Sequence, residues 1–369
     1  MARSSAFVAG AACVMALVLA AAATSAIAAA TPKKKHRSAT RIQTRAVSDD
    51  AADLVTYGRR EDVTRFAAEI AARRGLDPAW LQAALEASRF VPVVAKLIMP
   101  PPAGTAKNWA AYRGRFVEPL RIRAGMEFWR ANERWLRLAE ERYGVPPEIV
   151  VGIVGVETIY GQQMGGFRVI DALATLAFDF PPGRRDRSAF FRDELENFLV
   201  LCDAEGVDPL LPKGSYAGAM GMPQFMPSSF NKYAVDLDGD GRVDLNTSAA
   251  DVVGSVAHYL AEFGWQRGLP TRYAVAPPVD ARDRAVLLVP DILPSFSAAE
   301  FEARGAKLED AALGTDAKLA LVELQNGAAA PSYVAGTTNF YAITRYNWSS
   351  YYAMAVIDLG EAVARAVGR

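Results

Sequence analysis

The order of hydrophobic and polar residues along the chain predicts a protein made mainly of helices. Phe66, Ala67, Ile70 and Ala71 recur at helical spacing, and Gly75 is a typical residue for the end of such a helix. The same kind of pattern predicts further helices over residues 120–143, 148–156, 188–203, 249–263 and 347–367. From about residue 49 onward we therefore expect a mainly α-helical fold.

Prolines divide residues 270–337 into short apolar segments, unlike the helical regions on either side. The run Ala285–Val289 is stopped by a proline and suits a buried strand better than a helix. Leu319–Gln325 is typical of another strand, and the turn signal Asn326–Gly327 ends it. We therefore expect a small β-rich insertion within the helical protein, which makes the fold class mainly α with an α+β character.

The first 30 residues have the pattern of an export signal. Arg3 supplies the positive start, residues 6–30 are almost all small or apolar, and the alanine-rich end offers several A-x-A cleavage sites. A retained membrane anchor is the alternative, because roughly 20 apolar residues can span a bilayer. Cys13 also permits a lipoprotein, but the residues before it lack the expected leucine. We therefore favour a cleaved signal peptide over lipid attachment.

Charge is distributed unevenly along the chain. The first 45 residues hold seven of the 41 basic residues and no acid, so the remainder carries 34 bases against 41 acids. An acidic body argues against nucleic acid as a partner. Residues 31–48 are basic and lack an apolar period, which is typical of a flexible linker. Such a linker could associate peripherally with anionic wall polymer or with a membrane surface.

The overall composition excludes several classes of protein. Hydrophobic residues make up 51% of the chain, enough to bury a large core, so wholesale disorder is excluded. Only two cysteines and two histidines are present, which excludes a Cys/His zinc cluster and a disulfide framework. His258 is the one histidine outside the basic linker, which makes a Ser-His-Asp hydrolase a poor fit.

Glu157 is the first candidate for chemistry. It follows the almost wholly apolar run Ile149–Val156, so a helix at this point should be buried on most sides. A carboxyl group at the end of such a helix is partly desolvated, which raises its pKa and lets it act as a general acid near neutral pH. The alternative is a structural glutamate that caps a helix or forms a local ion pair.

The segment 213–229 is rich in glycine and methionine and surrounds Ser215 and Gln224. Its pattern is neither a helix face nor an alternating strand. Glycine lets the backbone approach another surface closely, and methionines can line an apolar cleft. We interpret the segment as either the wall of a cleft or a buried turn packed on the core.

An acidic loop over residues 236–244 has the spacing of a calcium-binding loop. Its acids at loop positions 1, 3, 5 and 9 are Asp236, Asp238, Asp240 and Asp244. The backbone carbonyl of Arg242 stands at position 7. Position 12 holds Thr247 in place of the usual glutamate, so another residue must complete the site, and Asp251 is the best candidate. The alternative is a solvated acidic turn.

Tyrosines are concentrated in residues 339–352 together with polar side chains. Aromatic faces and hydroxyl groups suit sugar rings, which offer C–H faces and many hydroxyls. A tyrosine-rich helix start in the core explains any single tyrosine equally well.

Together these segments resemble the membrane-bound lytic murein transglycosylase B family. The similar motifs occur in that family's order, and the resemblance covers about residues 50–369. The motifs are Val156–Gly161, Gly214–Ser229, the acidic loop, Gly254–Tyr259 and Asn339–Asn347.

The resemblance implies a lysozyme-like helical core, a small β-rich part and a structural Ca²⁺. It also implies cleavage of peptidoglycan between N-acetylmuramic acid and N-acetylglucosamine, which leaves a 1,6-anhydromuramic end. Glu157 matches the family's catalytic glutamate. The residues that match substrate-contacting or glutamate-supporting positions are Tyr112, Ser215, Gln224, Tyr259, Tyr341 and Tyr346.

The predicted organisation has five parts, and the exported protein is expected in the periplasm. The parts are a signal peptide (1–30), a basic linker (31–48), a helical catalytic region with the calcium loop (49–268), a β-rich part (269–337) and a C-terminal helix that returns to the catalytic core (338–369).

Two other functions stay open at this stage. A muramidase would hydrolyse the same bond with water, but it usually needs a second carboxylate across the bond. Acids such as Asp179, Asp186, Glu194 and Glu196 are available, although none lies in a sequence as apolar as that of Glu157. A non-catalytic, calcium-dependent wall-binding protein would not need Glu157 at all.

Overall fold

The computed structural model describes residues 55–58, 60–100 and 107–369. The predicted export signal and the basic linker therefore lie outside the described residues. Within the described ranges, no helix combines the length and the apolar character needed to cross a bilayer.

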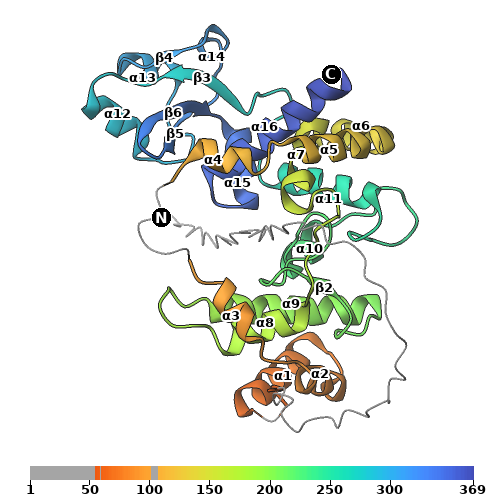
Figure 1. Cartoon of the computed structure of the whole chain (residues 1–369). Helices are drawn as coiled ribbons and strands as arrows, with labels where there is room; N and C mark the ends of the chain where they lie inside the picture. Colours follow the sequence, from red (N-terminus) through yellow and green to blue (C-terminus); the bar gives the residue numbers. More distant parts are fainter. Residues whose placement is uncertain (1–54, 59, 101–106) are drawn as a thin grey trace, which may run out of the picture.

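Helices dominate the structure and form two groups, one in the lower and one in the upper half of Figure 1. The lower group contains α1 (Glu61–Arg74), α2 (Pro78–Glu86), α3 (Pro92–Leu97), α8 (Val169–Phe178) and α9 (Ser188–Glu205). The upper group contains α4 (Trp109–Gly114), α5 (Pro119–Ala131), α6 (Glu133–Tyr143), α7 (Pro147–Thr158), α15 (Thr338–Tyr346) and α16 (Ser350–Val367). Between them lie α10 (Pro227–Tyr233) and α11 (Ala249–Glu262).

The predicted β-rich insertion contains an antiparallel sheet of strand order β4-β3-β6-β5. Its strands are β3 (Arg272–Ala276), β4 (Lys307–Leu308), β5 (Ala320–Asn326) and β6 (Ala329–Gly336), and α12 (Ala281–Leu288), α13 (Ala298–Ala303) and α14 (Asp310–Leu313) occupy the same region. Strands β5 and β6 form a hairpin at the predicted turn, with Leu321 opposite Ala335. A separate short pair joins β1 (Phe167–Arg168) to β2 (Lys213–Gly214).

One predicted strand is wrong. Residues 285–289 belong to α12 and its C-cap rather than to a buried strand. The carboxylate of Asp280 accepts hydrogen bonds from the backbone N–H groups of Arg282 and Asp283, so it caps a helix that begins at Ala281. Only Leu287 of this helix is buried. Because a short apolar run fits either structure, the capping residue decides the outcome.

The long helix predicted over 120–143 is two helices, α5 and α6. Asn132 separates them with φ −121° and ψ 19°, which is not a helical conformation. Its side-chain amide donates to the carbonyl of Phe128 at 2.9 Å. Short polar side chains that bond to nearby backbone groups compete with helix continuation, which explains the break.

Among the residues that the structure describes, the buried hydrophobic side chains form three clusters. One is built on α7, α11 and α16, a second on α1, α2, α8 and α9, and a third under the sheet. The helical region predicted over residues 49–268 therefore contributes to two clusters, one in each half of Figure 1.

Helices α7 and α16 are in direct backbone contact. A Cβ atom on Gly152 would lie 2.2 Å from the carbonyl oxygen of Val356, and one on Gly360 would lie 2.1 Å from that of Glu148. Any side chain at either position would therefore push the helices apart. This close packing places the start of α16 beside the end of α7, where Glu157 lies.

Candidate functional site

Glu157 lies in the last turn of α7 and is almost fully enclosed. Its residue is 9% exposed, and its carboxylate accepts a hydrogen bond of 2.6 Å from the hydroxyl of Tyr352 on α16. Burial raises the pKa of Glu157 to about 7, although the bond from Tyr352 acts in the opposite direction. A carboxyl group in this environment is partly protonated near neutral pH and can deliver a proton.

Tyrosines surround this carboxyl group. The negative charge of Glu157 contributes to raising the pKa values of Tyr112, Tyr346 and Tyr352, whose main cause is burial. The pKa of Tyr112 rises to about 12. The rings of Tyr346 and Tyr352 stack with centroids 6.3 Å apart, and the hydroxyl of Tyr346 donates to the carbonyl of Pro223 at 2.5 Å. All these hydroxyls stay protonated at neutral pH and can only act as neutral hydrogen-bonding groups.

The other two predicted tyrosines hold different positions. Tyr259 is buried on α11 and its ring packs on Tyr346 at 4.9 Å, while its hydroxyl donates to the carbonyl of Arg345. Glu157 also contributes to the raised pKa of Tyr259, behind burial. Tyr341 packs edge-to-face on Trp348. Tyr259 therefore packs in the group of tyrosines around Glu157, whereas Tyr341 contacts Trp348 and Arg345.

A tight turn follows Thr158, the last residue of α7. Ile159, Tyr160 and Gly161 all have left-handed backbone angles, with φ of 51°, 55° and 89°. A β-branched residue such as Ile159 rarely adopts this conformation, so the surrounding contacts must hold the turn in place. Thr158, which is fully buried, supplies some of these contacts.

The glycine-rich segment forms a series of tight turns next to the turn after α7, which it contacts through Met222. Ser215 Oγ accepts hydrogen bonds from the N–H groups of Ala217 and Ala219, so its own proton can still be donated. The side-chain amide of Gln224 donates to the carbonyls of Met164 and Gly221, which leaves its oxygen able to accept. Both predicted residues therefore stabilise the turns of this segment. Ser215 can still donate its hydroxyl proton, and Gln224 can still accept a hydrogen bond at its side-chain oxygen.

The acidic loop gathers three carboxylates at one point. Oxygens of Asp236, Asp238 and Asp251 lie within 4.8 Å of one another. Asp251 is 1% exposed and accepts N–H groups from Leu237 and Asp244, which fixes the loop to α11. Converging carboxylate oxygens are the donor set that Ca²⁺ prefers, so these residues fit a calcium ion.

The remaining predicted calcium ligands lie in the same loop. The carboxylate of Asp240 accepts the N–H of Arg242 at 2.9 Å. Asp244 turns toward the next residues and accepts the N–H groups of Asn246 and Thr247. Both carboxylates accept backbone N–H groups, but Asp251 belongs to the converging group with Asp236 and Asp238, so it has the better position to complete a cation site.

The sequence of this chain matches a known protein family over most of its length. The family model described as the transglycosylase SLT domain matches residues 58–361. The chain belongs to this family of lytic murein transglycosylases. The predicted mainly helical, lysozyme-like fold and the predicted enzyme class are thereby confirmed.

Individual relatives of this lytic transglycosylase support the same family assignment. It is 39% identical over 318 residues to membrane-bound lytic murein transglycosylase B of Escherichia coli, covering 84% of both chains. It is similar to the crystal structure of the soluble lytic transglycosylase SltB1 of Pseudomonas aeruginosa, with 40% identity, TM-score 0.76 and coverage of 84% of this chain and 100% of the other. It is also similar to the structure of E. coli Slt35 in complex with calcium, with 37% identity, TM-score 0.75 and coverage of 86% and 97%.

The sequence pattern does not predict two residues beside Glu157. Tyr352 makes the direct hydrogen bond to Glu157, yet nothing in the pattern distinguishes it among the tyrosines of residues 339–352. Thr158 follows Glu157 in the chain and bonds the carbonyl of Met222. A buried polar residue at the end of an apolar helix needs a partner, and that requirement was a signal that could have found it.

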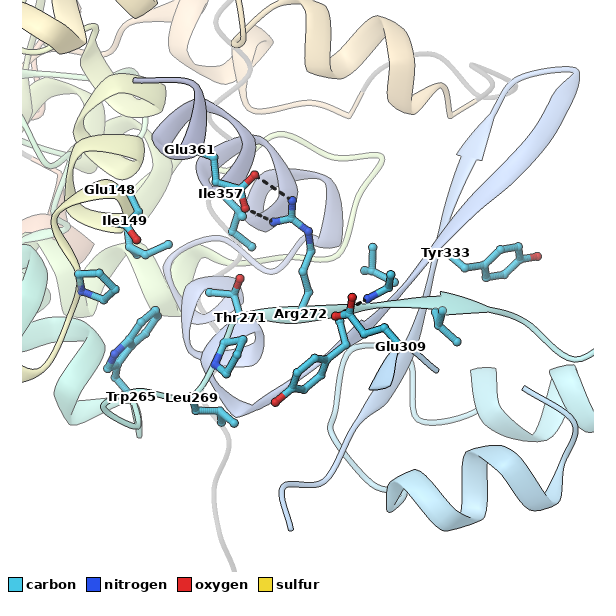
Figure 2. Close-up of a pocket in the computed structure, with 16 residues that line it drawn as sticks. Glu148, Ile149, Trp265, Leu269, Thr271, Arg272, Glu309, Tyr333, Ile357 and Glu361 are labelled. Atoms are coloured by element: carbon cyan, nitrogen blue, oxygen red, sulfur yellow. Dashed lines mark hydrogen bonds and ion pairs between the residues drawn. The ribbon is translucent and has the colours of Figure 1, made fainter. Parts of the chain in front are cut away.

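The enzyme also contains a cavity of about 580 Å³ between β3 and helices α7 and α16 (Figure 2). Arg272 on β3 bonds Glu361 on α16 at 3.1 Å beside it, which ties the insertion to the core. Glu148 lines this cavity, and it lies nine residues before Glu157 on α7. Nine residues are about two and a half helical turns, so the two glutamates point to opposite sides of α7. This cavity therefore lies on the other side of α7 from the carboxyl group of Glu157.

Proposed function

We propose that this lytic transglycosylase cleaves the β-1,4 bond between N-acetylmuramic acid and N-acetylglucosamine in peptidoglycan and leaves a 1,6-anhydromuramic end. The observation that supports this reaction is the environment of Glu157. It is buried among tyrosines, and burial together with the hydrogen bond from Tyr352 governs its pKa. We therefore assign both halves of the reaction to this one carboxyl group.

In the first half, protonated Glu157 donates its proton to the glycosidic oxygen as the bond to muramic C1 breaks. Positive charge develops at C1, and the 2-acetamido oxygen of the substrate stabilises it in place of a second enzyme carboxylate. In the second half, ionised Glu157 takes the proton of the muramic C6 hydroxyl, which attacks C1 and closes the anhydro ring. Glu157 ends protonated, so the cycle consumes no water.

The predicted substrate-contacting residues would keep the sugar in the geometry that this ring closure needs. Tyr112 and Tyr346 flank Glu157 and can hold sugar rings by their faces and hydroxyls. Ser215 can orient the acetamido group or Glu157 itself, and Gln224 can accept a sugar hydroxyl. Tyr259 would act indirectly, by packing on Tyr346. Tyr341 would contact sugar units further from the bond that is cleaved.

Product analysis by mass spectrometry tests the proposal. Wild-type enzyme acting on purified peptidoglycan should release muropeptides with anhydro ends, which lack one water relative to reducing ends. Glu157→Gln keeps the shape of the side chain but removes the proton, so it should bind glycan and release almost nothing. Reducing-end products from the wild type would favour a muramidase, whereas near wild-type release by the variant would remove Glu157 from the mechanism.

We also propose that the acidic loop binds a structural Ca²⁺. Side-chain oxygens of Asp236, Asp238 and Asp240 and the carbonyl of Arg242 would supply ligands, and Asp251 would complete them. The three converging carboxylates and the calcium complex of Slt35 support this assignment. A folded state that alone binds Ca²⁺ must melt at a higher temperature when the ion is added.

For its location, we propose export to the periplasm after cleavage of the signal peptide. The apolar N-terminal pattern supports export, and the E. coli relative is named as membrane-bound, an envelope location. Labelling cells with a radioactive fatty acid tests the fate of Cys13. We expect no label in the mature protein; a label that disappears in Cys13→Ser would show lipid attachment instead.

A further inference from the structure

Thr158 stands between Glu157 and the strained turn, and its hydroxyl is engaged in two directions. It donates to the carbonyl of Met222 at 2.8 Å, 64 residues further along the chain. It accepts the N–H of Gly161 at 3.0 Å. A threonine inside a helix would ordinarily bond to the carbonyl four residues earlier, but here that contact, to Val154, is longer at 3.4 Å. The hydroxyl therefore serves a bond between separate segments.

Both partners of this hydroxyl belong to structures that shape the catalytic site. Gly161 ends the run of three left-handed residues that follows Glu157. Met222 lies in the glycine-rich segment between Ser215 and Gln224, and its own N–H donates to the carbonyl of Leu245 at 2.8 Å. A single buried oxygen atom thus connects the end of the catalytic helix to the segment that carries the other polar groups of the site.

We propose that Thr158 is a positioning residue of the transglycosylase reaction, whose hydroxyl fixes Glu157 relative to the glycine-rich segment. This inference rests on the proposed function of Glu157. The hydroxyl does not touch the substrate. It holds the turn that ends α7 against the glycine-rich segment, so that the carboxyl group of Glu157 keeps its enclosed position beside Tyr352.

The chemistry of the bond explains why a hydroxyl is required. Valine has the shape of threonine but can neither donate to Met222 nor accept from Gly161. Thr158→Val would leave these two backbone groups without this partner, and the strained turn would lose a contact that offsets its strain. Serine retains the hydroxyl, so Thr158→Ser should preserve both bonds.

Thr175 offers a matched control in another part of the protein. It is also fully buried in a helix, and its hydroxyl likewise accepts a backbone N–H, from Val91, and contacts a carbonyl, that of Arg89. This bridge joins α8 to the segment before α3, in the lower helix group rather than near Glu157. Thr175→Val therefore removes the same kind of bond without disturbing the site.

The experiment compares full-chain wild type, Thr158→Val, Thr158→Ser and Thr175→Val on purified peptidoglycan and soluble glycan fragments. Melting temperature, kcat, KM and the pH profile of kcat are measured for each. We expect Thr158→Val to lose on the order of tenfold or more in kcat with KM changed by less than about threefold, as displacement of a catalytic group predicts. Its kcat should also begin to fall at a lower pH, because a displaced Glu157 is less enclosed.

Thr158→Ser should restore the kcat and the pH profile of the wild type, and Thr175→Val should lower the melting temperature while it keeps both. If Thr158→Val does not fold, Thr158→Ala is measured at low temperature in its place. The smaller side chain leaves room for a water molecule, which can bond the carbonyl of Met222 and the N–H of Gly161 and so preserve folding. A Thr158 variant that is folded and has the wild-type kcat and pH profile overturns the inference. Failure of the proposed function itself is visible separately, as activity of Glu157→Gln or as reducing-end products from the wild type.

Discussion

The end of α7 and the acidic loop both depend on carboxylates, but they place them in opposite surroundings. Glu157 is enclosed by protein and accepts one hydrogen bond from Tyr352, so burial dominates and its pKa rises to about 7. Asp236 accepts backbone N–H groups from Gly241, Gly239 and Asp240, and these bonds lower its pKa. The first environment favours the protonated carboxyl group that the proposed reaction needs, whereas the second favours the negative charge that the proposed cation site needs. Under both proposals, the surroundings of a carboxylate, rather than its residue type, separate catalysis from metal binding.

The largest expected effect tests whether burial alone makes a glutamate catalytic. Glu194 is also buried, 3% exposed, and burial raises its pKa, but its oxygens accept bonds from the N–H and hydroxyl of Ser228. Glu157→Gln should lower kcat by about 10²–10⁴-fold, the usual cost of losing a general acid. Glu194→Gln should stay active. Equal losses in both variants, measured as initial rates of anhydromuropeptide release, would contradict the comparison.

A second test measures how the enclosed carboxyl group of Glu157 changes the free energy of unfolding with pH. Because Glu157 holds its proton more tightly when folded, its favourable contribution is complete below pH 4.5 and is lost as the pH rises to about 7. Wild type should therefore lose roughly 3 kcal/mol relative to Glu157→Gln between pH 4.5 and pH 8. Urea unfolding of both proteins at the two pH values, at one Ca²⁺ concentration, measures the difference. A constant difference would show that Glu157 is not desolvated.

The acidic loop should affect stability and leave the proton chemistry unchanged. Ca²⁺ at 100 times its dissociation constant should stabilise the wild type by about 2.7 kcal/mol, seen as a higher melting temperature than in excess chelator. Asp238→Asn should reduce this gain but keep its kcat at temperatures where it is folded. Glu302→Gln, an exposed acid on α13, serves as the control and should keep the full gain. Identical melting curves with Ca²⁺ and with chelator would remove the calcium site.

The smallest effect concerns the hydrogen bond to Glu157. The hydroxyl of Tyr352 stabilises the ionised carboxylate, so Tyr352→Phe should raise the pKa of Glu157 further. The decline of kcat at high pH should then move upward by about one pH unit. Tyr346→Phe is the matched comparison, because its hydroxyl donates to Pro223 instead. A shift of the same size in both variants would mean that the bond from Tyr352 has no special role.

Local patterns predicted the parts of the site that depend on neighbouring residues. The apolar run before Glu157 predicts a buried helix, which the structure has. The spacing of Asp236 and Asp238 likewise predicts carboxylates that converge, and the structure gathers these two with Asp251, whereas Asp240 is not part of that group. Glycine-rich composition likewise indicated the tight turns around Ser215. These features follow from residues close together in sequence, so a single chain contains the information.

Features that depend on packing between distant segments were not predictable. The sequence offers several tyrosines near the C-terminus, and only the docking of α16 on α7 selects Tyr352 as the partner of Glu157. The same holds for the bond from Thr158 to Met222, which joins two turns. The strand expected at residues 285–289 failed for a different reason, because a short apolar run has no distinctive period and the cap at Asp280 decided its structure.

The contact between α7 and α16 also has a consequence in time. Tyr352 is synthesised 195 residues after Glu157, and Gly152 and Gly360, which allow the two helices to meet, are separated even more widely. While the chain is being synthesised, Glu157 therefore exists without this enclosure until α16 has been made and has packed on α7. The surroundings that raise its pKa are thus completed only after most of the described chain has been made.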